Sequence, residues 1–88
     1  MVDSLFKAIA DVNRRKILTL LHKQGTMSVS EIATHFDISL PTLSEHLRIL
    51  REAKVVTARK YKQYSQYSLN HAVFEELSNW VTEFLPQI

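Results

Sequence analysis

Pro41 is the residue that most constrains how this chain can fold. It stands inside the run SLPTLSEHLRILREAKVV, residues 39–56, in which leucines recur at the spacing of one helical face. Proline is tolerated only in the first turn of a helix, where its missing N–H has no intrahelical partner. The run therefore predicts a helix that begins within a residue or two of Ser39, with Ser39 or Leu40 as its cap.

A second helical pattern comes shortly before this one. Ser28 and Glu31 have the spacing of a capping box, in which each side chain binds the backbone N–H of the other residue. The helix that follows carries apolar residues up to Phe36 and is expected to end by Asp37. Only residues 37–39 then separate the two helices, and this short connection predicts a helix-turn-helix.

Two further helices are predicted at the start of the chain. Asp3 or Ser4 can cap the first, and Asp11 can cap the second, which stops at Gly25. Residues 26–28 then form a short extended link.

Residues after the helix-turn-helix change in character. Val, Thr and Tyr are frequent near 55–60 and 64–69, which predicts two strands of a hairpin with a basic tip. A last helix is expected from Asn70, its cap, to Pro86, which closes it. The predicted fold class is mainly α with a small β-hairpin, a winged helix-turn-helix, in one domain spanning residues 1–88.

Composition narrows the functional classes. The chain has 88 residues, 45% of them hydrophobic and 23% charged, which are ordinary globular values. It has no cysteine, which excludes disulfides, thiolate nucleophiles and iron–sulfur clusters. No apolar run is long enough to cross a membrane and no signal peptide is evident, so we expect a cytoplasmic protein. An enzyme is not expected, because Ser44 and His46 lie two apart on one helix and no third group orients a base.

Positive charge is concentrated at the end of the helix that begins near Ser39 and in the residues just after it. Residues 48–62 contain six basic residues and one acidic residue. Such a block can neutralise DNA phosphates, and slim polar side chains at a helix start can enter a major groove. A solvated helix face and a solubilising basic surface remain alternatives, as does a protein-interaction module whose basic wing binds an acidic partner. His46, beside the leucine row, is expected to be packed rather than to contact DNA.

The sequence resembles the ArsR/SmtB-type winged helix-turn-helix repressors over essentially its whole length. The resemblance is carried by LFKAIADVNRRKIL (5–18), SEIATHFDISLPTLSEHLRILREAKVV (30–56) and YSQYSLN (64–70). Within the family the chain is most similar to the SdpR-type autorepressors, which lack metal ligands. The resemblance implies a prokaryotic, nucleoid-associated homodimeric repressor, possible relief by another protein or ligand, and a palindromic double-stranded operator. The 39–53 helix is expected in the major groove and the 55–69 wing on the backbone or minor groove.

Candidate DNA contacts follow from the polar and basic residues themselves and from the family resemblance. The polar helix side and the basic block indicate Ser39 and Arg48. The resemblance adds Pro41, Thr42, Ser44 and Glu45 on the helix, and Arg59, Lys60, Lys62 and Gln63 on the wing. Leu40 stands where the family commonly has a polar contact residue, and Lys54 and Lys62 stand where it has glycine. Lys62 must therefore tolerate a turn that favours glycine.

The first and last helices carry more apolar residues than one small core needs. The family's pairing of these helices implies a dimer interface, although the same residues could instead complete the monomer core. The predicted interface residues are Leu5, Phe6, Ile9, Phe74, Leu77, Trp80, Val81 and Phe84. No cofactor or metal is expected: with His71 as anchor, three of the four ligands of the family's last-helix metal site are missing, although Glu75 shares a face with His71.

Overall fold

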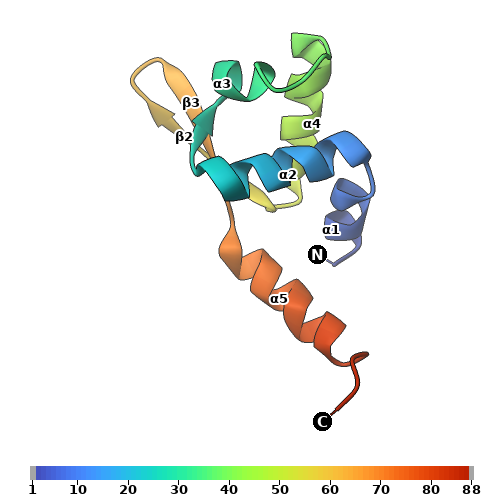
Figure 1. Ribbon diagram of the computed structural model, residues 1–88. Coiled ribbons are helices and arrows are strands. Elements are labelled where there is room, and N and C mark those ends of the chain that lie inside the picture. The colour runs from blue at the N-terminus through green and yellow to red at the C-terminus, as the bar shows by residue number, and fades with distance from the viewer. Residues whose placement is uncertain (1, 88) are drawn as a thin grey trace.

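A computed structural model describes residues 2–87 as a winged helix-turn-helix, the predicted fold class (Figure 1). The elements follow the order α1 (Val2–Ile9), α2 (Val12–Gln24), β1 (Met27–Ser28), α3 (Val29–Ala33), α4 (Leu40–Glu52), β2 (Val56–Tyr61), β3 (Tyr64–Leu69) and α5 (His71–Thr82). The molecule measures 48 × 24 × 23 Å, and α5 projects from the body that the other elements form.

A three-stranded antiparallel sheet forms the wing and joins it to the body. The strand order is β1-β3-β2, with Val56 opposite Leu69 and Tyr61 opposite Tyr64 in the β2–β3 hairpin. The strands begin and end within a residue of the predicted ranges. Lys62 and Gln63 alone make the tip, and Lys62 has a φ of 57°. Lys62 therefore adopts the left-handed conformation that normally favours glycine, as its position predicts.

Side-chain caps fix where three helices begin. Oδ1 of Asp11 accepts hydrogen bonds from the backbone N–H groups of Asn13 at 2.8 Å and Arg14 at 3.1 Å. The capping box of Ser28 and Glu31 is present, with both reciprocal bonds formed. These bonds satisfy N–H groups that have no partner inside the helix. The predicted caps of α2 and α3 are thus confirmed.

The same rule holds for α4. The Ser39 hydroxyl oxygen accepts from the backbone N–H of Thr42 at 3.2 Å, and Pro41 lies in the first turn of the helix. The start predicted from Pro41 is therefore confirmed.

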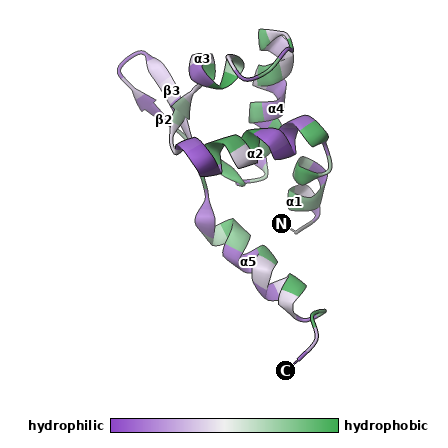
Figure 2. Ribbon diagram, in the orientation of Figure 1, coloured by the Kyte–Doolittle hydropathy of each residue, from purple (hydrophilic) through white to green (hydrophobic). Residues whose placement is uncertain are grey.

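The core lies where the apolar stripes of the helices meet the sheet, and Figure 2 shows those stripes alternating with polar ones along α2 and α4. Leu43, Leu47 and Leu50 of α4 are almost completely buried. The other fully buried large side chains are Ile17, Ile32, Val55 and Val56. Within residues 2–87, every helix is too short or too polar to span a lipid bilayer.

Some predicted boundaries are wrong. α1 already includes Val2, so Asp3 lies in its first turn and neither Asp3 nor Ser4 is its cap. α3 ends at Ala33 rather than near Asp37. Shorter-range bonds replace the helical ones there: the Thr34 hydroxyl binds the Glu31 carbonyl oxygen at 2.7 Å, and Phe36 packs on the core from the following turn.

The ends of α5 also differ from the prediction. Asn70 occupies the cap position, but its side chain makes no cap hydrogen bond. Its amide instead donates to the Lys54 carbonyl oxygen at 2.8 Å. At the other end α5 stops at Thr82, before Pro86 is reached, and turn-type bonds from Glu83, Phe84 and Leu85 follow.

Candidate nucleic-acid interface

The first turn of α4 presents small polar groups to solvent. Ser39, Pro41, Thr42 and Ser44 are all exposed. The Ser39 hydroxyl donates to Oγ1 of Thr42 at 2.9 Å, besides accepting from its backbone N–H. The cap therefore also orients the Thr42 hydroxyl. Ser44 makes no such bond to any residue from 2 to 87, so its hydroxyl can exchange hydrogen bonds with another molecule.

Leu40 departs from the leucine row to which its spacing assigned it. The row predicts burial, yet the Leu40 side chain is 59% exposed at the first position of α4, ahead of the turn that reaches the core. An apolar side chain thus stands among polar ones at the start of the helix.

Farther along α4, one arginine joins two acids on the outward side. Nε of Arg48 lies 2.9 Å from Oε1 of Glu45, and its two other nitrogens bind Oε2 of Glu45 at 2.5 Å and Oε2 of Glu52 at 2.6 Å. The hydrogen bond from Arg48 lowers the pKa of Glu45, and Glu45, followed by Glu52, raises the pKa of Arg48. The predicted phosphate contact at Arg48 is therefore already paired with two carboxylates inside the chain.

The basic residues of the wing point in different directions. Neighbouring residues in a strand face opposite sides of the sheet. Lys60 therefore shares the face of Val56, which is buried against the body, whereas Arg59 lies on the outer face. Lys62 occupies the tip, with Nζ 5.5 Å from the centre of the Tyr61 ring, and Gln63 beside it binds the Tyr64 hydroxyl at 3.1 Å. The wing carries its cations on both faces and at its end.

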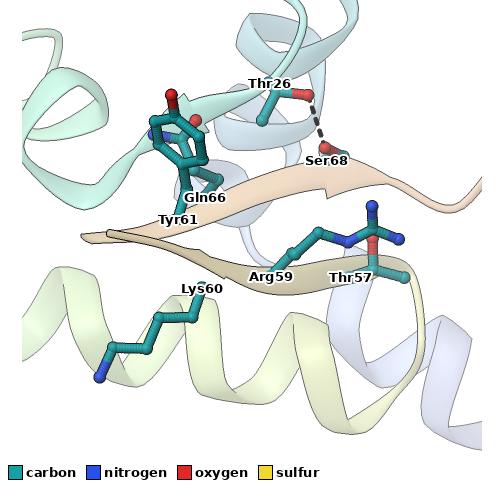
Figure 3. A pocket seen from close by; sticks show the side chains of 7 residues that line it. All are labelled: Thr26, Thr57, Arg59, Lys60, Tyr61, Gln66 and Ser68. Carbon is teal, nitrogen blue, oxygen red and sulfur yellow. Dashed lines mark hydrogen bonds between the residues drawn. The ribbon is translucent and has the colours of Figure 1, made fainter. Parts of the chain in front are cut away.

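A polar hollow of about 580 Å³ lies on the outer face of the wing (Figure 3). On one side of the hollow, the hydroxyls of Thr26 and Ser68 form a 2.7 Å hydrogen bond with each other. The residues that line it from the outer face are Thr26, Thr57, Arg59, Tyr61, Gln66 and Ser68. Lys60 also lines the hollow, although its position in β2 belongs to the opposite face. Of the lining residues, only Arg59 and Lys60 are predicted site residues. The alternation of positions 57, 59 and 61 in β2 is the sequence signal for Thr57 and Tyr61, whereas Gln66 and Ser68 join them through their pairing with Arg59 and Thr57.

His46 links the recognition helix to the first two helices, as its predicted packing requires. Its side chain is 12% exposed, and its Nδ1 lies 3.2 Å from a guanidinium nitrogen of Arg14 and 3.9 Å from Oδ1 of Asp11. Arg14 also donates to the carbonyl oxygen of Ala8 at 2.6 Å. The position of α4 is therefore tied to the junction of α1 and α2.

The predicted dimer surface is only partly available. Leu5 is 4% exposed and belongs to the monomer core, which leaves little of its side chain for an interface. Phe6 and Ile9 of α1 and Phe74 and Leu77 of α5 are half-buried.

The far half of α5 and the turn that follows it are exposed by contrast. The Phe6 and Trp80 rings meet edge to face at 5.3 Å, and the Trp80 and Phe84 rings at 5.0 Å. Trp80 is nevertheless 45% exposed and Phe84 69% exposed, and Val81 and Leu85 beside them are also exposed. Leu85 is not among the predicted interface residues, although the sequence places it on the apolar stripe of the last helix; in the structure it lies just beyond the end of α5.

A groove of about 410 Å³ runs along the solvent side of α2. Val12, Leu20 and Phe36 supply apolar surface, and Arg15, Lys16 and Lys23 supply three cations. In the part of the chain that the structure describes, no group of three or more His, Cys, Asp and Glu side chains could hold a metal ion.

Comparison with known proteins agrees with this geometry. Residues 11–58 match the family model described as "Bacterial regulatory protein, arsR family". The chain is 45% identical over 84 residues to the transcriptional repressor SdpR of Bacillus subtilis, covering 96% of this chain and 92% of that protein. It is 34% identical to an arsenical resistance operon repressor of Staphylococcus aureus, covering 86% and 72%. The crystal structure of an ArsR family transcriptional regulator matches with a TM-score of 0.84 and 28% identity, covering 93% and 84%.

Proposed function

Because this chain belongs to the ArsR family of bacterial regulatory proteins, we propose that it is a homodimeric transcriptional repressor that binds an inverted-repeat operator. Its relatives in this family are transcriptional regulators, and the chain is not an enzyme. One observation carries the proposal: the exposed polar start of α4 follows the short connection, residues 34–39, that joins it to α3 in a helix-turn-helix, and a cationic wing follows the same helix.

We propose that α4 enters the major groove with its first two turns. A groove about 12 Å wide admits an α-helix, and short hydroxyl side chains let the helix approach base edges closely. Ser44 offers a free hydroxyl for this contact, and the exposed Leu40 offers an apolar surface for a thymine methyl group. The Leu43, Leu47 and Leu50 row holds the opposite side of α4 in the core.

We propose that the wing supplies affinity rather than sequence reading. Lysine side chains that neutralise phosphates release counterions, and this contribution does not depend on base sequence. Lys62 at the tip and Lys60 on the body-facing side of β2 are the cations best placed to reach a duplex held by α4. Gln63 and Arg59 complete the proposed wing surface, with Arg59 the more distant of the two strand cations.

We propose that a second copy of the chain covers the exposed face of α5. The ring cluster of Phe6, Trp80 and Phe84 leaves apolar surface exposed beside Val81 and Leu85, and a contiguous exposed apolar patch marks an interaction site. Figure 1 shows α5 projecting from the body, where a second copy can reach it. A two-fold axis along this face would separate two recognition helices by about one DNA turn, roughly 34 Å. The operator is then an inverted repeat.

The test is to map the DNA that the protein protects upstream of its own gene. Protection of an inverted repeat that persists in excess random DNA is the expected result. Equal affinity for all DNA would contradict a sequence-specific repressor and would favour the alternative, a protein-interaction module whose basic wing binds an acidic partner.

A further inference from the structure

We infer that Glu45 reads the amino group of a cytosine in each operator half-site and that Arg48 is a positioning residue that holds the Glu45 carboxylate for this contact. The inference rests on the proposed function, because it assumes that α4 lies in the major groove. It assigns Arg48 to base recognition through Glu45 and not to a phosphate.

The geometry of the pair is the first support. The Arg48 guanidinium binds both oxygens of Glu45, at 2.9 Å and 2.5 Å, and this bidentate arrangement fixes the plane of the carboxylate. Its remaining terminal nitrogen binds Glu52 at 2.6 Å, which fixes the guanidinium in turn. Each carboxylate oxygen of Glu45 has a second lone pair, so it can still accept a hydrogen bond from another molecule.

The position of the pair on α4 is the second support. Residues 45, 48 and 52 are three and four apart, so they form one row along the helix, and Pro41 in the first turn continues that row. At 100° per residue the row lies opposite the buried leucines. Glu45 stands in its second turn, close behind the slim polar residues at the helix start. A carboxylate there faces any duplex that receives the start of α4.

Charge is the third support. One cation and two carboxylates leave the row with a net negative charge, and the guanidinium is already paired on both sides. A phosphate approaching Arg48 would meet both carboxylates, so this arginine is poorly placed to bind the backbone. The hydrogen bond from Arg48 also lowers the pKa of Glu45, which keeps the carboxylate ionised at neutral pH.

Base chemistry then selects the ligand. An ionised carboxylate only accepts hydrogen bonds, and the donors in the major groove are the amino groups of cytosine and adenine. Adenine presents its N7 acceptor beside that donor, and guanine presents two acceptors, so both would repel a carboxylate. Cytosine presents its amino group in the major groove and has no acceptor of its own beside it there. Cytosine is therefore the base that Glu45 prefers.

The experiment selects binding sites from random duplex DNA with the full-length protein and three variants, Glu45→Gln, Arg48→Lys and the double variant. The wild type is expected to enrich cytosine at one position of each half-site. Glu45→Gln is expected to exchange that cytosine for adenine, because an amide pairs with both groups of adenine, and to change the ratio of affinities by about 5- to 100-fold. Arg48→Lys keeps the charge but loses the bidentate hydrogen bonds of the guanidinium. A several-fold loss of cytosine preference is therefore expected, with an unchanged salt dependence of binding.

The double variant separates positioning from a direct contact. If Arg48 acts through Glu45, Arg48→Lys changes nothing further once Glu45 is glutamine. Glu75→Gln removes the same charge from the side of α5 opposite its apolar stripe and serves as the control. Three results would overturn the inference: continued enrichment of cytosine by Glu45→Gln, full cytosine preference in Arg48→Lys, or additive effects of the two substitutions on that preference. None of them would contradict the proposed repressor function. A wild type that enriches no motif would overturn the proposed function as well.

Discussion

The side-chain amide of Asn70 donates a 2.8 Å hydrogen bond to the backbone carbonyl oxygen of Lys54. The backbone N–H of Asn70 also donates to the Val55 carbonyl oxygen at 2.9 Å. Lys54 lies just beyond the end of α4, and Asn70 directly precedes α5. These two bonds join the recognition helix to the helix proposed to form the dimer. Pairing of two α5 helices would therefore also set the relative positions of two α4 helices.

Lys54 holds this junction in a conformation that suits glycine better. Its φ is 64°, its N–H donates to Arg51, and the next N–H donates to Leu50, the pattern of a left-handed helix end. We expect Lys54→Gly to raise the free energy of unfolding by about 0.5–1 kcal/mol, because relief of the left-handed strain exceeds the added chain entropy. Urea unfolding at one fixed protein concentration measures the change. Lys23→Gly, in the last turn of α2, is the control and should lower stability.

Asp11 should make the stability of the protein sensitive to acid. Hydrogen bonds from the backbone N–H of Arg14 and then Asn13 lower its pKa below the unfolded value of 3.8. The ionised form therefore stabilises the native state fully above pH 3.8, and this stability is lost as the pH falls through the lower folded pKa. We expect Asp11→Ala to cost about 1 kcal/mol at pH 7 and less below pH 3.8.

A matched cap without a charge isolates this effect. Ser39 caps α4 through a hydroxyl that does not titrate in this range, so the cost of Ser39→Ala should stay constant between pH 7 and pH 3. Urea unfolding of both variants at the two pH values gives the comparison. A cost for Asp11→Ala that is equally constant would show that the carboxylate charge contributes nothing to the cap.

Local rules were enough to predict most of the fold. Asp11, Ser28 and Ser39 act on N–H groups two or three residues away, and Pro41 excludes any earlier start of its helix. The information for these boundaries therefore lies within a few residues of each. The leucine row of α4 likewise follows from helical spacing, except at Leu40, where the helix extends past the core.

The cap of α5 and the burial of Leu5 depend on partners that lie elsewhere in the fold. Asn70 has the composition of a cap, but its amide binds Lys54, sixteen residues earlier, once the sheet brings them together. Leu5 and Phe6 are neighbours on α1, and only packing decides that the first is buried. Arg48 differs, because its acids lie three and four residues away, and that spacing in the sequence already predicts the pairing.

The two strand cations of the wing should differ in their effect on DNA binding. Lys60→Ala and Lys62→Ala are expected to weaken binding to all DNA and each to lower the salt slope by about 0.9, the value for one lost phosphate contact. Arg59→Ala should lower the slope by less, because Arg59 lies on the outer face of β2. Titration of binding against salt on operator and random duplexes measures all three. Equal slopes for Lys62→Ala and the wild type would contradict the wing placement.

The hydroxyls at the start of α4 should affect sequence preference. We expect Ser44→Ala and Thr42→Ala each to change operator preference by about 1–3 kcal/mol, as a lost base contact does. Thr42→Ala also removes the partner of the Ser39 hydroxyl, whereas Ser44→Ala leaves the cap intact. Competition between operator and random DNA measures the preference. Uniform loss on both DNAs would show that these residues do not read bases.

Phe84 tests the proposed dimer most directly, because its side chain is 69% exposed and, within residues 2–87, Trp80 supplies its aromatic ring pair. We expect Phe84→Glu to produce a monomer at micromolar concentration, since an uncompensated carboxylate cannot be buried in an apolar interface at acceptable free energy. Sedimentation velocity gives the oligomeric state.

The buried core of the monomer lies on other residues, so the Phe84→Glu chain should retain its helical circular dichroism and its weak binding to random DNA. Its operator affinity should fall, because two half-sites are no longer bound by one linked pair of recognition helices. Gln87→Glu adds the same charge nearby without removing apolar surface, and it should remain dimeric. A Phe84→Glu protein that still sediments as a dimer would place the interface elsewhere and would remove the structural reason for expecting an inverted repeat.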